Sequence, residues 1–439
     1  MTRIFPPYAY GDGPRTGCWW DETVDAIEHP QLLDSIKCDV VIVGGGFTGL
    51  SAAYSLARAG ASVVVLEAEH VGWGASGRNG GFCCLGGGMA PDAVLDHRYG
   101  RAGRGAWRST EAAAVHYVSD LAETLGLDLQ LHSDGETCLA HSEKTMRAFE
   151  AEADRIQENY GVTAEVLGAS DLAAAGMSGP FFGALSVPIG FGLNPARLVR
   201  GLRDAAISAG ARIFDQSAVT EISGNQVRTS QGQVAAERII IATNGYSNED
   251  IPAWMAAKYM PAQSTVLVTR PISPEERDRA GWTTDRMVYD SRNLLHYFRV
   301  LPDGRFLFGM RGGLMSAPAV EARARARVER DFRLMFPDWA DVAVTHSWSG
   351  MVCLARNMVP FIGPLPGQPH ILAGFAYHGN GVAMGTYAGK MLADLALGQT
   401  PDLYPQAVRD AARAFPLGTW RRAAMWPIYG ALHLQDRWS

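Results

Sequence analysis

A short apolar run, a glycine turn and a stretch with helical periodicity follow one another within residues 39–67. Residues 40–43 are all β-branched, which is typical of a strand buried on both faces. Apolar residues then recur at helical spacing through 50–57, and Gly60 stands where a helix would end. A second apolar run at 62–66 predicts another buried strand. The pattern therefore predicts a complete βαβ unit.

The turn has the G-x-G-x-x-G spacing, with glycines at Gly44, Gly46 and Gly49. In a dinucleotide-binding unit the first glycine permits the tight turn, the second lets a pyrophosphate approach the backbone, and the third lets helix and strand pack closely. Glu67 lies 18 residues after Gly49, where a carboxylate accepts hydrogen bonds from ribose hydroxyls, which favours FAD or NAD over NADP. The alternative is a glycine-rich turn without a ligand, but both strands, the helix and the acid are in register here.

Two further strands end in glycine turns. One apolar strand at 238–242 leads into Asn244 and Gly245, and another at 371–375 leads into 379–381 and a helix that runs to about residue 397. A doubly wound sheet binds its ligand at the carboxyl ends of its strands, so we expect these turns to face the same ligand as the first turn. The other elements predicted nearby are strands at 211–214 and 219–222, a hairpin at 227–234, and a helix at 195–209 with Asn194 as its N-cap.

Apolar and polar residues alternate later in the chain, at 265–270, 293–300 and 305–313, which predicts antiparallel strands of a second sheet. The predicted fold class is α/β (α+β overall), with a Rossmann-like doubly wound dinucleotide-binding domain and a mainly antiparallel-sheet substrate domain. The predicted division is an N-terminal arm at 1–36, a discontinuous dinucleotide-binding domain at 37–90, 191–250 and 340–397, a substrate domain at 91–190 and 251–339, and a C-terminal segment at 398–439 packed on the body. Helices are expected at 145–160 and 319–336, with their charged faces in solvent.

A glycine-rich loop follows Glu67, and eight of the 17 residues at 72–88 are glycine. Such a loop cannot bury an apolar core of its own, so its use is close backbone approach to something flat or phosphorylated. The alternative is a flexible linker. Three large residues inside the loop, Trp73, Arg78 and Phe82, argue against a flexible linker.

Composition and charge limit the kinds of partner and the compartment that are expected for this protein. The 439 residues are 47% hydrophobic and 19% charged, with a net charge of −6, so neither nucleic acid nor an anionic membrane is indicated as a partner. The six cysteines form no C-x-x-C pair and no metal-ligand spacing, which is typical of free thiols in a reducing compartment. No secretory signal and no transmembrane span are expected from the sequence, so a cytoplasmic location is predicted.

These motifs resemble the D-amino-acid oxidase-like superfamily of FAD-dependent amine oxidoreductases. Three segments carry the resemblance, namely 43–49 with Glu67, 242–245, and 374–381 with the helix that follows. The loop at 72–81 is similar to the subgroup typified by γ-glutamylputrescine oxidoreductase. The resemblance implies FAD as the cofactor, and no covalent-attachment motif is matched around Cys83 or His378, so non-covalent FAD is expected.

The resemblance also implies the cofactor contacts. Beyond Gly44, Gly46, Gly49 and Glu67, the residues expected around FAD are Phe47, Thr48, Ala68, Trp73, Gly74, Ala75, Ser76, Arg78, Asn79, Gly80, Gly81, Val219, Thr243, Asn244, Gly245, Gly379, Asn380, Gly381 and Val382. Among them, 379–382 are expected to point backbone N–H groups at the flavin pyrimidine oxygen. A helix N-terminus there stabilises the negative charge of the reduced flavin.

The resemblance implies that Arg311 is the carboxylate clamp of the substrate site, because an arginine from the substrate sheet often binds a carboxylate through two hydrogen bonds in this superfamily. The alternative for Arg311 is a structural ion pair. Tyr297 lies on the neighbouring predicted strand, where His296 and Arg299 point to opposite faces, so only one of those two is expected to line the site. The remaining catalytic candidates are Trp348 and Tyr377, as an aromatic wall around an amine, and His378, as an acid/base or as a hydrogen-bond partner of the cofactor.

The predicted reaction is oxidation of a primary or secondary amine: an amino acid, an N-methyl amino acid or a γ-glutamyl amine. Hydride passes from the α-carbon to flavin N5, and the imine hydrolyses to an aldehyde or keto acid plus an amine. The electron acceptor is O₂ or an electron carrier, because the lysine that activates oxygen in sarcosine oxidases has no match here. The alternatives are a flavin monooxygenase, or a non-catalytic FAD-binding subunit of a multi-subunit amine dehydrogenase.

Overall fold

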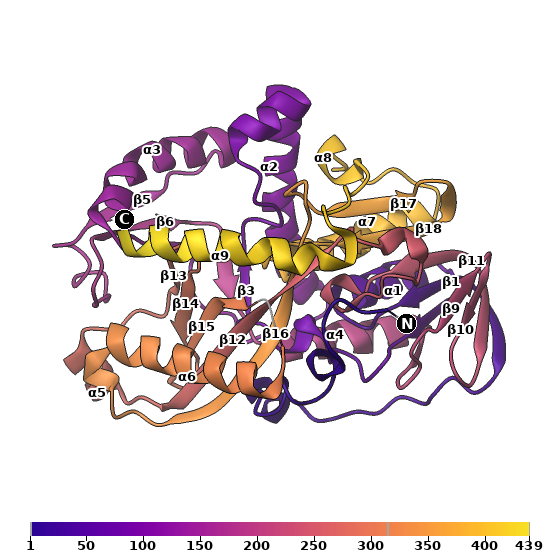
Figure 1. Cartoon of the computed structure of the whole chain (residues 1–439), viewed down its shortest axis with the longest axis horizontal. Helices are drawn as coiled ribbons and strands as arrows, with labels where there is room; N and C mark the ends of the chain where they lie inside the picture. Colours follow the sequence, from indigo (N-terminus) through magenta and orange to yellow (C-terminus); the bar gives the residue numbers. More distant parts are fainter. Residues whose placement is uncertain (1, 314–315, 439) are drawn as a thin grey trace.

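The computed structural model describes residues 2–313 and 316–438 (Figure 1). The strands of these residues form two eight-stranded sheets and one two-stranded ribbon, β3 (Phe82–Cys84) with β7 (Gly190–Gly192). The first sheet is parallel at its centre and the second is mainly antiparallel. The α/β fold class expected from the sequence is therefore confirmed.

Parallel strands form the centre of the first sheet, where β1 pairs with β11 on one side and with β2 on the other. Val41 and Ile42 of β1 are fully buried and point into separate apolar clusters on the two faces of the sheet. The strands in spatial order are β17 (Phe361–Leu365), β18 (Gln368–Phe375), β11 (Gln233–Ile241), β1 (Ser35–Val43), β2 (Val63–Leu66) and β8 (Arg212–Phe214), with β10 (Gln226–Arg228) paired to the start of β11 and β9 (Glu221–Ser223) paired to β10.

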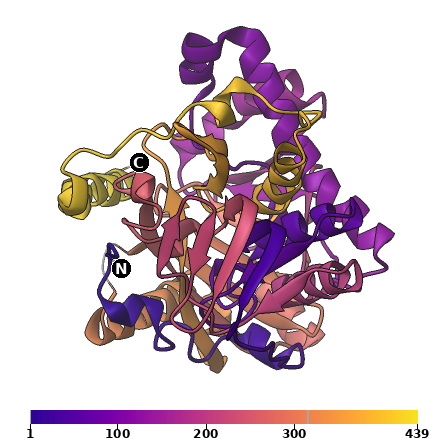
Figure 2. The same ribbon diagram turned by 90° about the vertical axis from the view of Figure 1, so that its right-hand side faces the viewer.

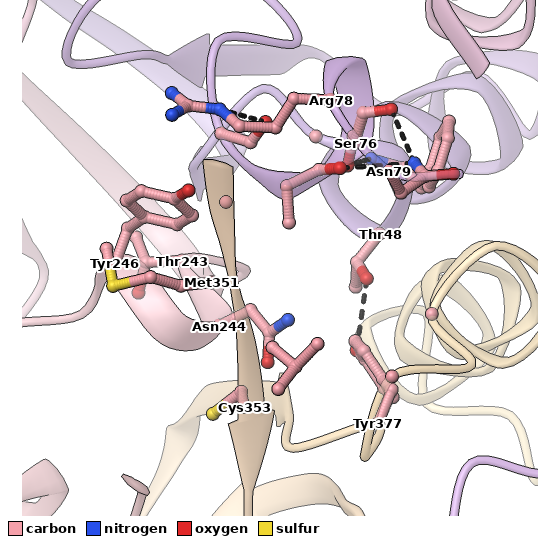
Figure 3. Close-up of a pocket in the computed structure, with 18 of the residues that line it drawn as sticks. Thr48, Ser76, Arg78, Asn79, Thr243, Asn244, Tyr246, Met351, Cys353 and Tyr377 are labelled. Carbon is pink, nitrogen blue, oxygen red and sulfur yellow. Dashed lines mark hydrogen bonds between the residues drawn. The ribbon is translucent and has the colours of Figure 1, made fainter. Parts of the chain in front are cut away.

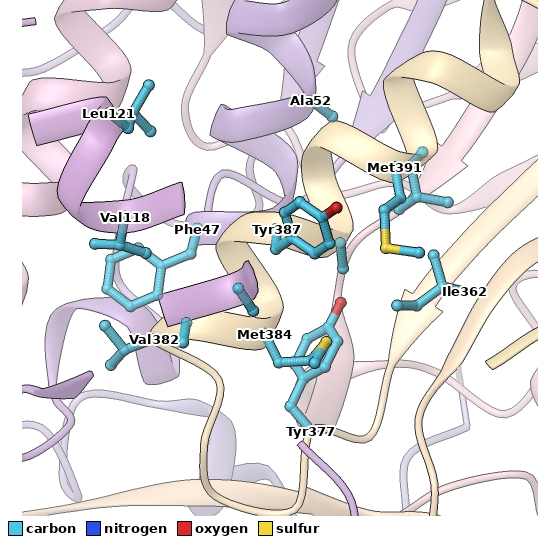
Figure 4. Packing of buried hydrophobic residues seen from close by; sticks show 14 of the residues in the cluster. Phe47, Ala52, Val118, Leu121, Ile362, Tyr377, Val382, Met384, Tyr387 and Met391 are labelled. Atoms are coloured by element: carbon cyan, nitrogen blue, oxygen red, sulfur yellow. The ribbon is translucent and has the colours of Figure 1, made fainter. Parts of the chain in front are cut away.

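Helices cover this sheet and pack closely on one another. A Cβ atom on Gly389 would lie 2.4 Å from the carbonyl oxygen of Thr48, so glycine is what allows α7 to approach α1. Figure 4 shows Phe47, Val118 and Met384 in one cluster, which brings three helices together. The helices concerned are α1 (Phe47–Arg58), α2 (Asp92–Thr124), α4 (Pro195–Ser208) and α7 (Ala383–Ala396).

The second sheet packs its outer face on α6 through a cluster of aromatic residues. Phe298 and Phe306 of the sheet meet Phe336 and Trp339, which follow the helix. The strands in spatial order are β16 (Val344–Leu354), β12 (Met260–Pro271), β15 (Arg305–Gly313), β14 (His296–Val300), β13 (Met287–Asp290), β4 (Glu136–Leu139), β6 (Gly183–Val187) and β5 (Glu165–Gly168). The associated helices are α3 (Glu143–Tyr160), α5 (Pro274–Ala280) and α6 (Pro318–Met335).

Some elements lie where local sequence signals predicted them. Asn194 caps α4 by accepting N–H groups of Ala196 and Arg197, as predicted. The strand predicted at 219–222 begins two residues later, as β9, although the backbone N–H of Thr220 already donates to the carbonyl oxygen of Arg228 at 2.8 Å. The segment 340–397 was assigned to the dinucleotide-binding domain, but its first strand, β16, pairs with β12 of the second sheet along its whole length. The division into domains stays a prediction.

The C-terminal helix α9 (Arg421–Trp438) lies along the margin of the molecule after α8 (Gln406–Arg409) and a long connection (Figure 2). Its first residue, Arg421, forms a buried ion pair with Glu249, with N–O distances of 2.9 and 2.6 Å. Near its other end, Asp436 accepts the backbone N–H of Asn293 at 2.8 Å and of Leu294 at 3.1 Å. Among the described residues, none of the helices has the length and apolar character that a membrane span requires.

Candidate active site

One cavity of about 380 Å³ is lined by residues of both sheets. The glycine turn after β1, the glycine-rich loop after β2 and the turn after β11 contribute its lining, as does the turn between β18 and α7. Figure 3 shows Thr48 and Tyr377 pointing toward one another below Ser76 and Asn79, with Asn244 and Cys353 beside them. The three glycine turns predicted to face one ligand therefore do meet at one cavity.

Steric contacts explain the glycines of the first turn. Gly44 has φ of 110°, and a Cβ there would lie 2.8 Å from the carbonyl oxygen of Ala242. A Cβ on Gly49 would lie 1.9 Å from the carbonyl oxygen of Gly44, so only glycine lets α1 start against β1. A Cβ on Gly46 would lie 2.8 Å from Ser76 Oγ. Gly49 packs inside and does not line the cavity, whereas Gly44 and Gly46 do.

Glu67 at the end of β2 faces the cavity beside Ala68 and Val219. Its Oε2 accepts the N–H of Gly45 at 2.7 Å and its Oε1 accepts the N–H of Glu69 at 3.1 Å. Burial raises the pKa of the Glu67 carboxyl to about 7, although these N–H groups act in the opposite direction. The acid is thus held by the backbone in the position where a ribose would meet it.

The glycine-rich loop is a folded structure and not a flexible linker. Arg78 is 2% exposed and donates to the carbonyl oxygen of Trp73 at 2.6 Å and of Ser349 at 3.2 Å, while its guanidinium stacks 4.3 Å from the Trp73 ring. The Asn79 amide donates to the carbonyl oxygens of Ala75 and Ser76. The loop is therefore tied to itself and to β16. The loop residues that line the cavity are Trp73, Gly74, Ala75, Ser76, Arg78, Asn79 and Gly80, whereas Gly81 lies behind them.

The other two turns lock onto each other. Asn244 Oδ1 accepts the N–H of Ala376 at 2.9 Å, which joins the turn after β11 to the turn after β18. Thr243 and Asn244 line the cavity, while Gly245 packs toward Met351 and Cys353. Gly379, Asn380, Gly381 and Val382, which were predicted to meet the flavin, line the cavity at the start of α7. Two helix N-termini, of α1 and α7, therefore face the same space, and both favour negative charge there.

One face of the second sheet supplies the opposite wall. Arg311 of β15 lies over Gly379, where a Cβ would be 2.3 Å from its Nη2, and Nη2 is 3.5 Å from Asn380 Oδ1. Tyr297 of β14 shares a hydrogen bond of 3.0 Å with Ser264 Oγ, and its ring packs edge-on against Phe82. Both residues line the cavity.

His378 lines the cavity, but the backbone engages both of its ring nitrogens. The N–H of Ala355 donates to Nε2 at 3.1 Å, so the ring is neutral with its proton on Nδ1, which donates to the carbonyl oxygen of Gly87 at 3.2 Å. Burial lowers the pKa of His378. The geometry therefore assigns His378 to positioning the turn before α7 and leaves no ring nitrogen for proton transfer.

The predicted aromatic wall is wrong for Trp348. Its side chain is fully buried between Trp20 and the glycine-rich loop, where Nε1 donates to the carbonyl oxygen of Arg78 at 2.7 Å, and it does not line the cavity. Tyr377 does line the cavity, but its hydroxyl lies 3.0 Å from Thr48 Oγ1, on the side of the glycine turn. The aromatic residues on the second-sheet side are Tyr297 and Tyr289.

Neither His296 nor Arg299 lines the cavity, against the expectation that one of them would. His296 points to the outer face, where Nδ1 lies 2.8 Å from Asp290. Arg299 is buried behind the loop and donates to the carbonyl oxygens of Gly80 at 3.0 Å and Leu193 at 2.6 Å. Arg299 therefore supports the loop that carries Gly80 from the side away from the cavity.

Sequence reasoning missed several lining residues: Cys84, Glu136, Tyr289 and Leu295. Glu136 had a usable signal, because it is a charged residue within an otherwise uncharged strand, β4. Its carboxyl is buried, and burial raises its pKa to about 8.

Residues 39–395 match the model of a family described as FAD dependent oxidoreductase. The chain belongs to this family. The probable oxidoreductase OrdL of Rhizobium meliloti is 31% identical over 416 residues, which cover 93% of this chain and 94% of that protein. The γ-glutamylputrescine oxidoreductase of Escherichia coli is 31% identical over 370 residues, which cover 84% and 85%. The crystal structure of glycine oxidase from Geobacillus kaustophilus superimposes with a TM-score of 0.69 at 20% identity, covering 85% of this chain and 99% of that one.

As a member of the FAD-dependent oxidoreductase family, the protein uses FAD, and the residues present fit it. The glycines of the first turn leave room for a pyrophosphate to bind the backbone. The N-termini of α1 and α7 favour the negative charge of the pyrophosphate and of a reduced flavin. Glu67 lines the cavity where it can accept hydrogen bonds from the ribose. The expectation of an FAD-dependent enzyme is confirmed, and its relatives include enzymes named for amines and amino acids.

Proposed function

We propose that this protein oxidises a primary or secondary amine that also carries a carboxylate group, such as an amino acid, an N-methyl amino acid or a γ-glutamyl amine. The observation that carries the proposal is the position of Arg311, whose guanidinium lies over Gly379 where α7 begins. A carboxylate bound by this guanidinium would sit beside the turn expected to meet the flavin. The names of the relatives agree with this chemistry: γ-glutamylputrescine oxidoreductase, glycine oxidase and iminodiacetate oxidase.

Each group of residues at the site has a separate role in the proposed reaction. When bound, FAD supplies the hydride acceptor at N5. Arg311 binds and orients the substrate carboxylate, and the rings of Tyr297 and Tyr289 exclude water from the amine. The N-terminus of α7 stabilises negative charge at its end of the cavity. Cys83 does not line the cavity and His378 is engaged by the backbone, which supports non-covalent binding of FAD.

The proposal is tested with the purified holoprotein under anaerobic conditions, by adding N-methyl amino acids, D-amino acids, γ-glutamyl amines and polyamines and following the flavin absorbance. At least one class that bears a carboxylate is expected to bleach the flavin bands. Admitting air and timing the reoxidation then separates an oxidase from a dehydrogenase. If only amines without a carboxylate reduce the flavin, or none does, the proposal is wrong.

Arg311→Met gives the sharper form of this test. Losing a charge-assisted pair with the substrate is expected to raise KM for the carboxylate-bearing amine by about 10- to 100-fold. Arg323→Met is the matched control, because Arg323 is exposed on α6. An equal KM in Arg311→Met and wild type would remove Arg311 from the substrate site.

A further inference from the structure

The wall formed by the second sheet carries a carboxyl group and a guanidinium group at positions that the strand register fixes. Tyr289 pairs with Cys138 of β4 and with Tyr297 of β14, and Tyr297 pairs with Gly309 of β15. Residues two apart on a strand share a face, so Glu136 and Arg311 lie on the same face as these tyrosines. Glu136, Tyr289, Tyr297 and Arg311 all line the cavity.

Glu136 is buried, and no cation among the described residues forms an ion pair with it. The residue is 9% exposed, and its side chain contacts Cys84 of the ribbon strand β3. The charged and titratable groups around it are Glu111 of α2, Tyr289 and the thiols of Cys83, Cys84 and Cys138, and no cation of the described residues is among the causes that shift its pKa. A carboxylate in such a place is costly unless a cation joins it, so an unliganded Glu136 holds its proton.

We propose that Glu136 is a subsite for a second, cationic group of the substrate, so that the preferred substrate carries an ammonium group as well as the carboxylate bound by Arg311. This inference rests on the proposed function for the role of Arg311. The ammonium displaces the proton of Glu136 and forms an ion pair with it, between the rings of Tyr289 and Tyr297, whose faces also attract cations.

The strand register fixes the backbone positions of Glu136 and Arg311. Three strand-to-strand steps, about 14 Å, separate β4 from β15, and the register also places the two residues four positions apart along the strands, about 13 Å. Their Cα atoms therefore lie about 19 Å apart, and the two side chains and the hydrogen bonds at their ends cover part of this distance. The ligand that joins them is an extended chain with a carboxylate at one end and an ammonium at the other, and 6-aminohexanoate is a simple flexible chain of this kind.

Binding of two simple acids tests the proposal without turnover. 6-Aminohexanoate carries both charges, and heptanoate replaces the ammonium with a methyl group of similar size. Isothermal titration of the oxidised holoprotein under nitrogen, with the flavin spectrum recorded to show that no reduction occurs, is expected to give a Kd for 6-aminohexanoate at least tenfold lower than for heptanoate. If 6-aminohexanoate binds no more tightly than heptanoate, or does not bind, the proposal is overturned.

Variants test whether Glu136 causes the preference for 6-aminohexanoate over heptanoate. Glu136→Gln keeps the shape of the neutral side chain and is expected to bind both acids alike, whereas Glu165→Gln, an exposed glutamate of β5 in the same sheet, keeps the wild-type preference. Arg311→Met is expected to weaken both acids and to keep the preference. A preference that survives in Glu136→Gln, in a variant that retains its FAD spectrum, overturns the proposal.

Proton release gives a second readout. Titrations at pH 7 in buffers of different ionisation enthalpy are expected to show that 6-aminohexanoate displaces a proton from the wild type and none from Glu136→Gln. Binding without proton release would contradict a protonated Glu136. Because none of these measurements needs catalysis, a protein that binds as expected but is reduced by no amine would refute the proposed function and leave the subsite standing.

Discussion

The imidazole of His378 accepts the backbone N–H of Ala355 through Nε2 at 3.1 Å, which joins the turn before α7 to the residue that follows β16. The two residues follow strands of different sheets. The bond fixes the tautomer, places the proton on Nδ1, and holds His378 at φ of 51°, a left-handed conformation that is unusual for a residue other than glycine. The turn that faces the flavin side of the cavity therefore depends on a neutral histidine.

A neutral His378 predicts a definite pH dependence. The pKa of His378 is lowered in the folded protein. Below about pH 6.5 His378 is therefore protonated in the unfolded chain but remains neutral in the folded protein, so its contribution to stability falls as the pH falls. We expect His378→Gln to lose about 1–3 kcal/mol of stability, since a buried N–H loses its partner. The rate of flavin reduction should keep its pH profile in this variant. A profile that loses one ionisation near pH 6–7 would instead identify His378 as an acid/base.

Substituting Gly49 is expected to lower FAD binding, although no side-chain contact is removed. In Gly49→Ala the new Cβ would lie 1.9 Å from the carbonyl oxygen of Gly44, so the start of α1 must move away from β1. FAD content after purification is expected to fall severely, together with the melting temperature. Gly105→Ala is the matched control, because a Cβ there meets nothing within 4 Å on exposed α2, and it should gain up to about 1 kcal/mol. Equal FAD content in both variants would refute the packing role of Gly49.

The cofactor half of the site could be predicted because its signals are local. Gly44, Gly46, Gly49 and Glu67 belong to one strand–helix–strand unit, in which steric limits and the helix N-terminus dictate residue types at fixed spacing. Arg311 and Tyr297 were reached from the alternation of polar and apolar residues, which identifies a face of a strand without showing what that face meets.

The substrate half depends on pairing between distant segments, which a single sequence does not record. Trp348 was misplaced because Trp20 and the glycine-rich loop, both distant in sequence, pack against its side chain and keep it from the cavity. Glu136 was missed because β4 reaches the cavity only by pairing with β13, some 150 residues later in the chain. Contacts of this kind follow from the assembled sheet, and local propensity cannot supply them.

Glu67 links FAD affinity to pH. Burial raises its folded pKa to about 7, so the carboxyl of the apoprotein is largely protonated at pH 6 and largely ionised at pH 8. Since an ionised carboxylate is the better acceptor for ribose hydroxyls, the Kd of the apoprotein for FAD should decrease over this range. Glu67→Gln should bind FAD more weakly and with little dependence on pH. Exposed Glu237→Gln should follow the wild type, and an unchanged slope in Glu67→Gln would exclude Glu67 as its cause.

The same carboxyl has the opposite effect on the stability of the apoprotein. Between its unfolded pKa of about 4.3 and its folded pKa of about 7, the folded state binds the proton more tightly, so this contribution to stability is present at low pH and is lost as the pH rises through the window. Urea unfolding of apoprotein at pH 5 and pH 8 should show a smaller change in Glu67→Gln than in wild type. An identical change in the two proteins would contradict the raised pKa.

Arg421 holds the C-terminal helix through a single buried ion pair. It is 1% exposed, and besides Glu249 it donates to the carbonyl oxygen of Tyr259 at 2.9 Å, so Arg421→Met leaves the Glu249 carboxylate buried with one fewer cation. Removing one partner of such a pair costs about 3–5 kcal/mol, and hydrogen exchange of α9 should become faster even where the rest of the protein is unchanged. Exposed Arg413→Met is the control and should match the wild type in both measurements. Unaltered exchange in Arg421→Met would mean that the contacts of Asp436 with Asn293 and Leu294 suffice to hold the helix.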